Sequence, residues 1–192
     1  QNATALSRAD GSRESKFPKI GHNYESPDYK NLFIAGTASH SLDFRKSAGG
    51  FIHGFRYTAQ SLHNILEWRN HRVPWPSHRF KTTDLLSAIV KRINEASGIY
   101  QMFSVLGDVI VLKDNEEAVF VEDFPINLLA EFSGVTGHEA GPVIVIVLEY
   151  GPNFSGPGKD IFSPDRATGE PSEAHTSNFL HPVFYYYKRL PS

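Results

Sequence analysis

Two prolines within four residues interrupt the chain at 73–76 and constrain its fold more than any other feature. The motif reads Val-Pro-Trp-Pro. Because proline lacks a backbone N–H and clashes with the preceding helical turn, a helix cannot run through it. Any helix upstream has to end before Val73. We therefore predict a domain boundary here, with residues 1–28 as a loop or linker, 29–73 as a first unit and 77–192 as a second unit.

Upstream of the prolines, apolar residues recur at helical spacing. Steps of three and four residues separate them, so they would line one face of a helix that we expect to begin near Ser47. Gly49, Gly50 and Gly54 fall in its first turns, where each glycine costs about 1 kcal/mol relative to alanine. Glycines are expected there if a ligand or another stretch of backbone comes close. The apolar face comprises Phe51, Phe55, Ala59, Leu62 and Leu66.

Downstream of the prolines, one helix and several short strands are predicted. Thr82 or Thr83 can cap the helix, and Gly98 can end it. Lys91 and Arg92 lie toward its end, where the helix dipole favours cations. Its apolar face comprises Leu85, Ile89, Ile93 and Ala96. Strands are predicted at 100–103, 109–112, 118–121, 143–150 and 183–187, with a hairpin at 114–115, a central strand at 143–148 and a long surface loop at 151–178.

The composition excludes several classes of protein. The formal net charge is −2, and the sequence lacks the basic face that a nucleic-acid binder usually carries. There is no cysteine, so the chain cannot form a disulfide, a zinc–thiolate site or a thiol redox pair. No apolar run approaches the roughly 20 residues of a membrane-spanning helix. The histidines show no ligand spacing, so we expect no metal site. Because the chain begins at Gln1, we expect it to be a piece of a longer protein.

One segment combines a strand, a polar loop and a helix that opens on small residues. Asn31–Ala35 is apolar and predicts a buried strand that ends at Gly36. Since Gly36 has no Cβ, a cofactor could approach its backbone. Ala48, Gly49 and Gly50 would leave the first N–H groups of the helix free, and such donors favour a negative charge. The arrangement suits an extended, electron-rich cofactor.

This segment resembles the last FAD-binding motif of flavoproteins with two dinucleotide-binding domains, which include thioredoxin reductases and flavin monooxygenases. The motif is a strand ending in Ala-Gly-Asp or Ala-Gly-Thr, a basic pair and a glycine-rich helix start. Here its parts are Ala35-Gly36-Thr37, Arg45-Lys46 and Ala48-Gly49-Gly50. Over roughly residues 17–66, the sequence is similar to FAD-dependent oxidoreductases of the endoplasmic reticulum lumen. The resemblance implies an α/β fold, in which the C-terminal strand–helix end of a Rossmann-like FAD domain is followed by a small α+β domain.

The resemblance also implies which residues contact FAD, but it names no catalytic residue. Gly36 and Thr37 would lie beside the ribityl-pyrophosphate part, with Thr37 in place of the more common Asp. Four residues would border the isoalloxazine edge, and two glycines would let the helix N-terminus face the flavin. They are Arg45, Lys46, Ser47 and Ala48, followed by Gly49 and Gly50. The phosphate fingerprint Gly-x-Gly-x-x-Gly is absent from this chain, so the segment alone should not hold FAD.

Two roles are possible for several polar and aromatic residues. His40 and Asp43 could form an acid–base pair near a flavin, or they could hold the loop by side-chain hydrogen bonds, which is common for Asp. His53 and Arg56 lie off the apolar face and are expected to face solvent or another domain, with cofactor contact as the alternative. Residues 185–187 are three tyrosines, which could be a stacking platform or a strand packed on one face.

The function implied by the resemblance is that of a parent enzyme. It would be an FAD-dependent oxidoreductase of the endoplasmic reticulum lumen with NAD(P)H as electron donor. It would act in the degradation of misfolded glycoproteins, with chaperone or degradation proteins as partners. Sequons at Asn2 and Asn153 would suit a glycosylated luminal protein. Two alternatives remain: an enzyme like the flavin monooxygenases, or a flavoprotein in which residues 77–192 recruit partners or dimerise the enzyme.

Overall fold

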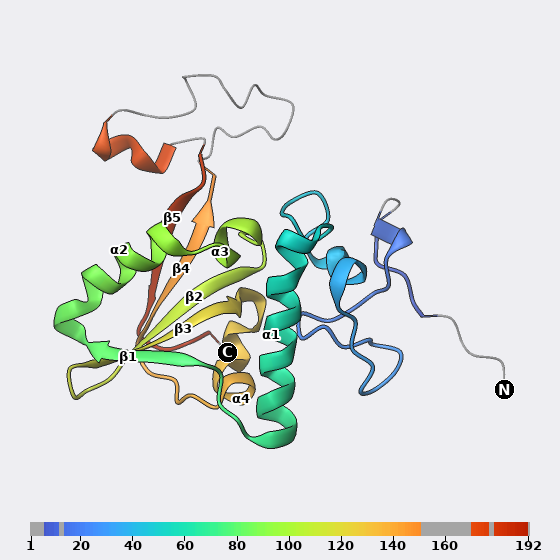
Figure 1. The fold of residues 1–192 in the computed structure, drawn as a ribbon, viewed down its shortest axis with the longest axis horizontal. Coiled ribbons are helices and arrows are strands. Elements are labelled where there is room, and N and C mark those ends of the chain that lie inside the picture. Colours follow the sequence, from blue (N-terminus) through green and yellow to red (C-terminus); the bar gives the residue numbers. More distant parts are fainter. Residues whose placement is uncertain (1–5, 12–13, 151–169, 177–178, 192) are drawn as a thin grey trace.

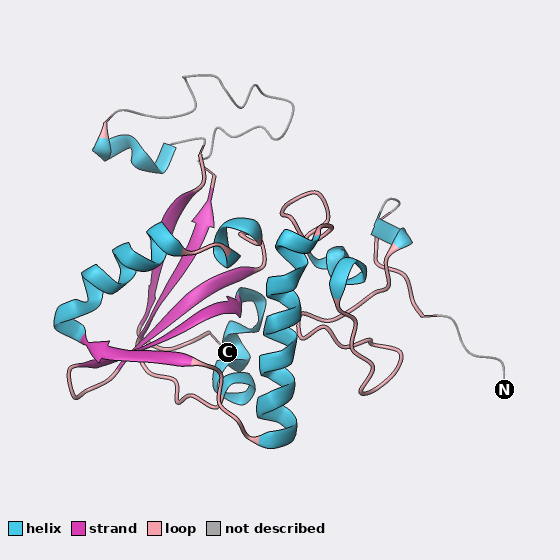
Figure 2. Ribbon diagram, viewed as in Figure 1, coloured by secondary structure: helices cyan, strands magenta, loops and turns pink. Residues whose placement is uncertain are grey.

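A computed structural model describes residues 6–11, 14–150, 170–176 and 179–191 (Figure 1). The fold is mixed α/β, with one five-stranded antiparallel sheet and helices around it (Figure 2). The strand order is β1-β3-β2-β4-β5. The helices are α1 (Ile52–His71), α2 (Leu85–Glu95), α3 (Gly98–Gln101) and α4 (Phe132–Thr136). The strands are β1 (Ser77–Lys81), β2 (Leu106–Leu112), β3 (Glu117–Pro125), β4 (Val143–Glu149) and β5 (His181–Tyr187).

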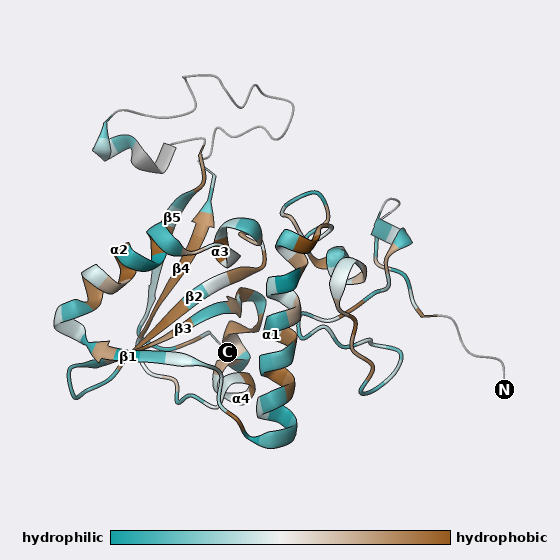
Figure 3. Cartoon of the chain, viewed as in Figure 1, coloured by the Kyte–Doolittle hydropathy of each residue, from teal (hydrophilic) through white to brown (hydrophobic). Residues whose placement is uncertain are grey.

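The two faces of the sheet carry separate apolar clusters, because neighbouring side chains on a strand point to opposite faces. On one face, Val109 and Val145 pack with Leu62 and Ile65 of α1. On the other face, Ile110 and Ile146 pack with Ile89 of α2. Hydrophobic colouring runs along β2 and β4 in Figure 3, which agrees with the burial of both strands. The predicted hairpin and the predicted interior strand at 143–148 are confirmed, since β2 pairs with β3 and β4 lies between β2 and β5.

Helix α1 lies between the N-terminal region and the sheet (Figure 1). It begins at Ile52, five residues later than predicted, and ends at His71, before the prolines. Its most buried side is rotated from the predicted apolar face. Phe51, which precedes the helix, is 66% exposed, whereas Leu62 is buried as predicted. The buried residues of α1 are Gly54, Thr58, Ser61, Leu62, Asn64 and Ile65. Small residues occupy this side because the loop before α1 and strand β3 come close to it.

Helix α2 confirms the predicted helix, with a single turn of 3-10 helix at Thr82–Asp84 before it. It ends at Glu95, and Gly98 starts the short helix α3 instead of acting as the stop. The strand predicted at 100–103 is wrong, since α3 and a turn occupy these residues. The strand predicted for Asn31–Ala35 is also wrong. Phe33 makes only an isolated bridge to Glu25, and a 3-10 helix begins at Gly36.

The Pro-Trp-Pro segment joins α1 to the sheet and does not separate two cores. Trp75 is 2% exposed and belongs to the same apolar cluster as residues of α1, β2 and β4. Its indole N–H donates to the Glu122 carbonyl at 3.1 Å, and its backbone N–H donates to Thr136. The division into 29–73 and 77–192 therefore stays a prediction about the organisation of a longer protein. Most of the loop predicted at 151–178 lies outside the described residues, and Pro171–Thr176 is a 3-10 helix.

No described helix is long and apolar enough to cross a membrane.

Candidate cofactor-contact site

The loop that resembles the FAD motif opens with a 3-10 helix at Gly36–Leu42. Gly36 has a φ of 71°, a left-handed conformation that glycine adopts without strain. The Ser39 hydroxyl donates to the Gly36 carbonyl at 2.8 Å and fixes this first turn. A Cβ at Gly36 would have no atom within 4 Å. The space beside the Gly36 backbone is therefore open, and its contact with a cofactor stays a prediction.

A buried carboxylate organises the rest of the loop. Asp43 is 1% exposed. It accepts hydrogen bonds from the Ser47 hydroxyl at 2.6 Å and from the Gly49 N–H at 2.9 Å, and its other oxygen lies 2.8 Å from His40 Nδ1. Three donors thus satisfy a charge that would be costly to bury alone. Asp43 holds the loop closed against the start of α1.

Two further contacts fix the loop to the segment around α3. The Ser47 and Ser104 hydroxyl oxygens are 2.9 Å apart, and the Ala48 N–H donates to the Gln101 carbonyl at 2.9 Å. These residues are separated by more than fifty positions in the sequence. The two contacts therefore attach the loop to the segment around α3.

The glycines at the helix start serve this packing. A Cβ on Gly49 would lie 2.2 Å from Asp43 Oδ1, and one on Gly54 would lie 2.1 Å from the Ala48 carbonyl oxygen. The N–H groups of Ala48 and Gly49 are also occupied, by Gln101 and Asp43. The expectation that these residues present free helix donors is therefore wrong for both of them. Gly50 lies against His40, with a Cβ position 3.2 Å from the imidazole ring.

The eight predicted contact residues divide into two groups. Thr37, Arg45 and Lys46 are exposed, and Gly36 has open space beside it. The other four, at 47–50, are partly or fully buried and shape the loop. The Ser41 hydroxyl is buried in the same loop and has no hydrogen-bond partner among the described residues. The Thr37 hydroxyl, the two cations and the open backbone at Gly36 fit an anionic cofactor such as FAD. In that arrangement, the exposed residues would border the cofactor, and the buried residues at 47–50 would hold the exposed residues in place.

The contacts of His40 support its structural reading. Its ring lies between Phe17 and Phe44, with both centroid distances at 5.4 Å in edge-to-face geometry. Its Nδ1 contacts Asp43, which already has two other donors. These contacts match the reading of a loop held by side-chain hydrogen bonds. His53 and Arg56 are exposed, as expected from their position off the apolar face.

Two exposed apolar residues beside the loop escaped the sequence analysis. Phe51 and Ile52 are 66% and 70% exposed, and the Phe51 ring stacks on His53. Within the described residues, the N–H groups of Ile52 and His53 do not donate to a backbone carbonyl. In the described part of the chain, the first turn of α1 thus has free backbone donors at these two residues. The helical spacing had suggested an inward Phe51, and only the late start of α1 places it outside.

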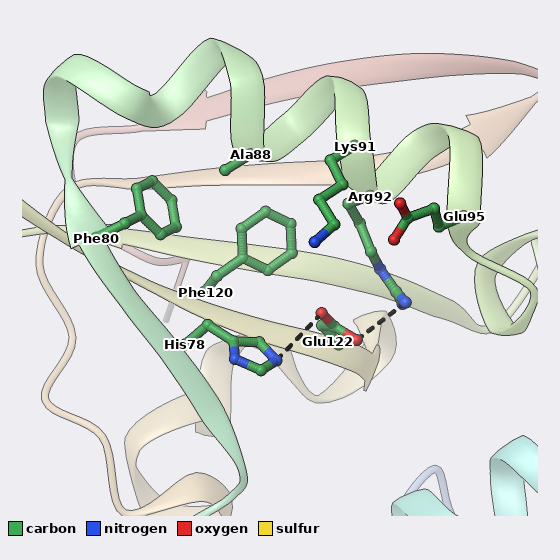
Figure 4. Close-up of a pocket in the computed structure, with 8 residues that line it drawn as sticks. All are labelled: His78, Phe80, Ala88, Lys91, Arg92, Glu95, Phe120 and Glu122. Atoms are coloured by element: carbon green, nitrogen blue, oxygen red, sulfur yellow. Dashed lines mark ion pairs between the residues drawn. The ribbon is translucent and has the colours of Figure 1, made fainter.

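A second polar site lies between α2 and strands β1 and β3, away from the loop (Figure 4). It is an open cavity of about 430 Å³ with Phe80 and Phe120 in its wall. Arg92 crosses it and makes a bidentate pair with Asp108, at 2.8 and 3.0 Å. The guanidinium also contacts Glu122 and Asp123, each at 2.9 Å. Sequence reasoning gave Arg92 a role at the helix dipole, whereas its main role is to neutralise carboxylates of β2 and β3.

Burial also changes the acidity of this cluster. Desolvation raises the pKa of Asp123 from 3.8 to about 6; Arg92 opposes the shift, and Asp108 and Glu122 add to it. No group of three or more His, Cys, Asp or Glu side chains suited to a metal ion occurs in the described part of the chain.

The chain is thus a mixed α/β protein with a loop at 36–50 that exposes Thr37, Arg45 and Lys46. The chain is similar to FAD-dependent oxidoreductase domain-containing protein 2 of Mus musculus, at 55% identity over 179 residues, which is 92% of this chain and 27% of that protein. It is 44% identical to the Danio rerio protein of the same name over 187 residues, which is 96% of this chain and 26% of that protein. The names of both relatives support the family of FAD-dependent oxidoreductases that the loop motif resembles.

The chain spans about a quarter of the length of the curated relatives it matches. No protein-family profile matches the chain. No solved structure matches it either. The predicted acceptor asparagines, Asn2 and Asn153, lie outside the described residues.

Proposed function

We propose that the chain is part of an FAD-dependent oxidoreductase and that its loop at 36–50 borders the cofactor in the parent protein. The observation that carries this proposal is the 55% identity, over nearly the whole chain, to a protein named for FAD-dependent oxidoreduction. Identity at that level implies a shared fold and supports a shared role. The open backbone at Gly36 and the exposed Arg45 and Lys46 supply the surface that such a cofactor would need.

In this proposal, residues of the chain position the cofactor and tune its charge. FAD supplies the electron-transfer chemistry when it is bound. Gly36 allows close approach, and the Thr37 hydroxyl offers a neutral hydrogen bond where related motifs place a carboxylate. Arg45 and Lys46 favour negative charge near the loop. Asp43, which is buried, keeps the loop in the shape that presents these groups.

Flavin content of the purified parent protein tests the proposal. The double variant Arg45→Ala, Lys46→Ala should weaken FAD binding by about tenfold or more, because two cations close to an anionic cofactor are lost. The control is Arg79→Ala, Lys81→Ala, which removes the same two residue types from the exposed strand β1. Flavin absorbance and FAD titration measure the effect. Equal losses in both variants would contradict the loop's role, and a parent protein without any flavin would contradict the class of enzyme.

The wider cellular role is also a proposal. An endoplasmic reticulum location, NAD(P)H as donor, and chaperone or degradation partners are supported by the resemblance over residues 17–66. Since the chain has no cysteine, an acceptor thiol would have to come from elsewhere in the parent or from a partner. Oxidation of NADPH and of NADH by the purified parent protein, followed by absorbance, tests the donor. Microscopy of the parent protein with a luminal marker tests the location.

A second candidate function is a recruiting module formed by residues 77–192. Its support is the aromatic strand β5, where Phe184 and Tyr186 are 49% and 62% exposed. Alanine substitution of both residues in the parent protein separates the two roles. Loss of partner capture with flavin absorbance intact favours recruitment, whereas loss of bound flavin favours a structural part of the enzyme.

A further inference from the structure

The two edges of the sheet differ in chemistry. Edge strand β1 reads Ser-His-Arg-Phe-Lys, and its exposed His78, Arg79 and Lys81 discourage pairing with another strand. Edge strand β5 reads His-Pro-Val-Phe-Tyr-Tyr-Tyr and has no Lys, Arg, Asp or Glu. Among the described residues, no strand pairs with the outer side of β5 (Figure 1). In the described part of the chain, the edge at β5 therefore lacks the usual protection, apart from Pro182 near its start.

The face of the sheet beside this edge is also apolar and uncovered. Phe184 and Tyr186 pair with Ile146 and Ile144 of β4, so they share the face that carries α2. Both are exposed, at 49% and 62%. The helix does not cover them.

Helix α2 extends the uncovered surface. Its flank with Ala88 and Lys91 lines the cavity next to β1 and β3. Leu86 and Val90, one turn apart, lie on the opposite flank and so face the β4–β5 side of the sheet. They are 74% and 48% exposed. Exposed apolar side chains thus occur both on α2 and on the outer strand β5, on the same face of the sheet, and exposed apolar groups that gather on one face can mark an interaction site.

We propose that this edge pairs with the β5 edge of a second copy of the chain, antiparallel about a twofold axis at Tyr185. Two five-stranded sheets would then form one continuous sheet. With Tyr185 on the axis, Phe184 of each copy lies opposite Tyr186 of the other, on the apolar face. Pro182 lies opposite Lys188, at the end of the paired segment, where a missing N–H does least harm. The proposal does not depend on the cofactor.

Charge selects the antiparallel arrangement and a second copy as the partner. Lys188 and Arg189 follow β5 at one end, and Glu149 of β4 lies beside His181 at the other end. Antiparallel pairing brings the basic end of one copy toward the end that holds Glu149 in the other. Parallel pairing would place the basic ends together, where they repel. The uncharged segment between the ends is complementary to itself, as a twofold interface requires.

Sedimentation velocity of the 192-residue chain across a dilution series tests the proposal. The wild type should have twice the 21.5 kDa mass of one chain at micromolar concentration. Phe184→Lys with Tyr186→Lys should raise the dimer dissociation constant by about tenfold or more, since like charges would then face each other. The control Phe51→Lys with Ile52→Lys changes two apolar residues elsewhere that are even more exposed, and this variant should remain a dimer. A monomeric wild type, or a dimer that persists in the β5 variant, overturns the proposal.

A single cysteine tests the register independently of the charge variants. Because the chain has no native cysteine, Tyr185→Cys provides its only thiol. On the twofold axis, the two thiols are close enough for a short bismaleimide to link the copies, which is read as a doubled mass in denaturing electrophoresis. Arg79→Cys, on the opposite edge, should give almost no linked product. Equal linkage at both positions, or none at Tyr185→Cys, contradicts pairing through β5. Far-UV circular dichroism confirms that each variant is folded.

Discussion

At the scale of single residues, the loop depends on an aspartate that sequence reasoning left undecided. Asp43 could have been an acid–base group or a structural one. Its burial and its contacts with Ser47, Gly49 and His40 match the structural reading. The glycines were predicted to mark a close approach, and the neighbour of Gly49 is this carboxylate. A sequence motif can signal that space is tight without showing which group fills it.

The close contact makes Gly49→Ala a sharp test of this packing. An added Cβ would lie 2.2 Å from Asp43 Oδ1, so either the carboxylate or the loop has to move. We expect a loss of about 1–3 kcal/mol in the free energy of unfolding, which is typical of overpacking. Urea denaturation followed by circular dichroism measures it. The control is Gly134→Ala in α4, where a Cβ meets no atom within 4 Å and helix propensity favours alanine. Equal stability in the two variants would contradict the packing.

At the scale of secondary structure, one arginine anchors α2 to the sheet. Arg92 reaches from α2 to Asp108, which is fully buried in β2. Burial acts to lower the pKa of Arg92, but the hydrogen bonds and charge of Asp108, together with the charges of Asp123 and Glu122, outweigh it and raise that pKa. Since Asp108 also accepts the Asp123 N–H at 2.9 Å, the pair ties the helix to two strands.

Removal of this anchor should destabilise the fold strongly. Arg92→Met keeps the length of the side chain but leaves Asp108 buried without a cation. We expect a loss of about 3–5 kcal/mol in the free energy of unfolding, measured by denaturant titration. The exposed neighbour provides the control, and Lys91→Met should change stability little. Adding Asp108→Asn to Arg92→Met removes the stranded charge and should recover part of the loss. If the double variant recovers no stability, packing of the side chain, and not its charge, holds α2 against the sheet.

The elements that the sequence predicted are those with strong internal patterns. Helix α2 has a regular apolar face, and β4 is a continuous aliphatic run that can only be buried. Strand β1 was missed because Ser77–Lys81 is polar and exposed, and it is a strand only through its pairing with β3. The strand prediction for Asn31–Ala35 was wrong for the opposite reason. It has the composition of a strand, but the described residues offer it only an isolated bridge.

At the scale of the whole molecule, the charge cluster joins elements from both predicted units. The Ser61 hydroxyl of α1 donates to the Asp123 carbonyl at 3.0 Å, while the Asp123 carboxylate contacts Arg92 of α2. Gly98 leaves room for that carboxylate, since a Cβ there would lie 2.2 Å from it. Protonation of Asp123 is therefore linked to the stability of the entire fold.

The raised pKa of Asp123 predicts a specific dependence of stability on pH. Below pH 3.8, Asp123 is protonated in both the folded and the unfolded chain. Between about pH 4 and pH 6, the folded chain binds this proton more tightly than the unfolded chain does. The stabilisation that the protonated Asp123 gives to the folded chain is therefore lost as the pH rises through 6. A shift of this size corresponds to about 3 kcal/mol. Denaturant titrations at pH 4, 5, 6 and 7 measure the free energy of unfolding.

Asp123→Asn is the matched variant for this test. Asparagine tolerates the positive φ of 51° at this position and keeps one acceptor oxygen, but it does not titrate. As the pH rises from 4 to 6, the wild type should lose stability relative to the variant. Above pH 7, the difference between their free energies of unfolding should be constant. A difference independent of pH would show that Asp123 ionises normally in the folded chain.

The sequence by itself determined the local elements with strong periodicity, the end of α1 before the prolines and the loop motif that led to flavoproteins. It could do so because periodicity, proline geometry and a short motif are properties of neighbouring residues. Only the tertiary structure decided that Trp75 joins α1 to the sheet in one core, that Asp43 occupies the space beside Gly49, and that β5 is an edge strand of the described sheet. These features depend on contacts between residues far apart in the sequence, where burial and hydrogen bonding, and not local preference, set the outcome.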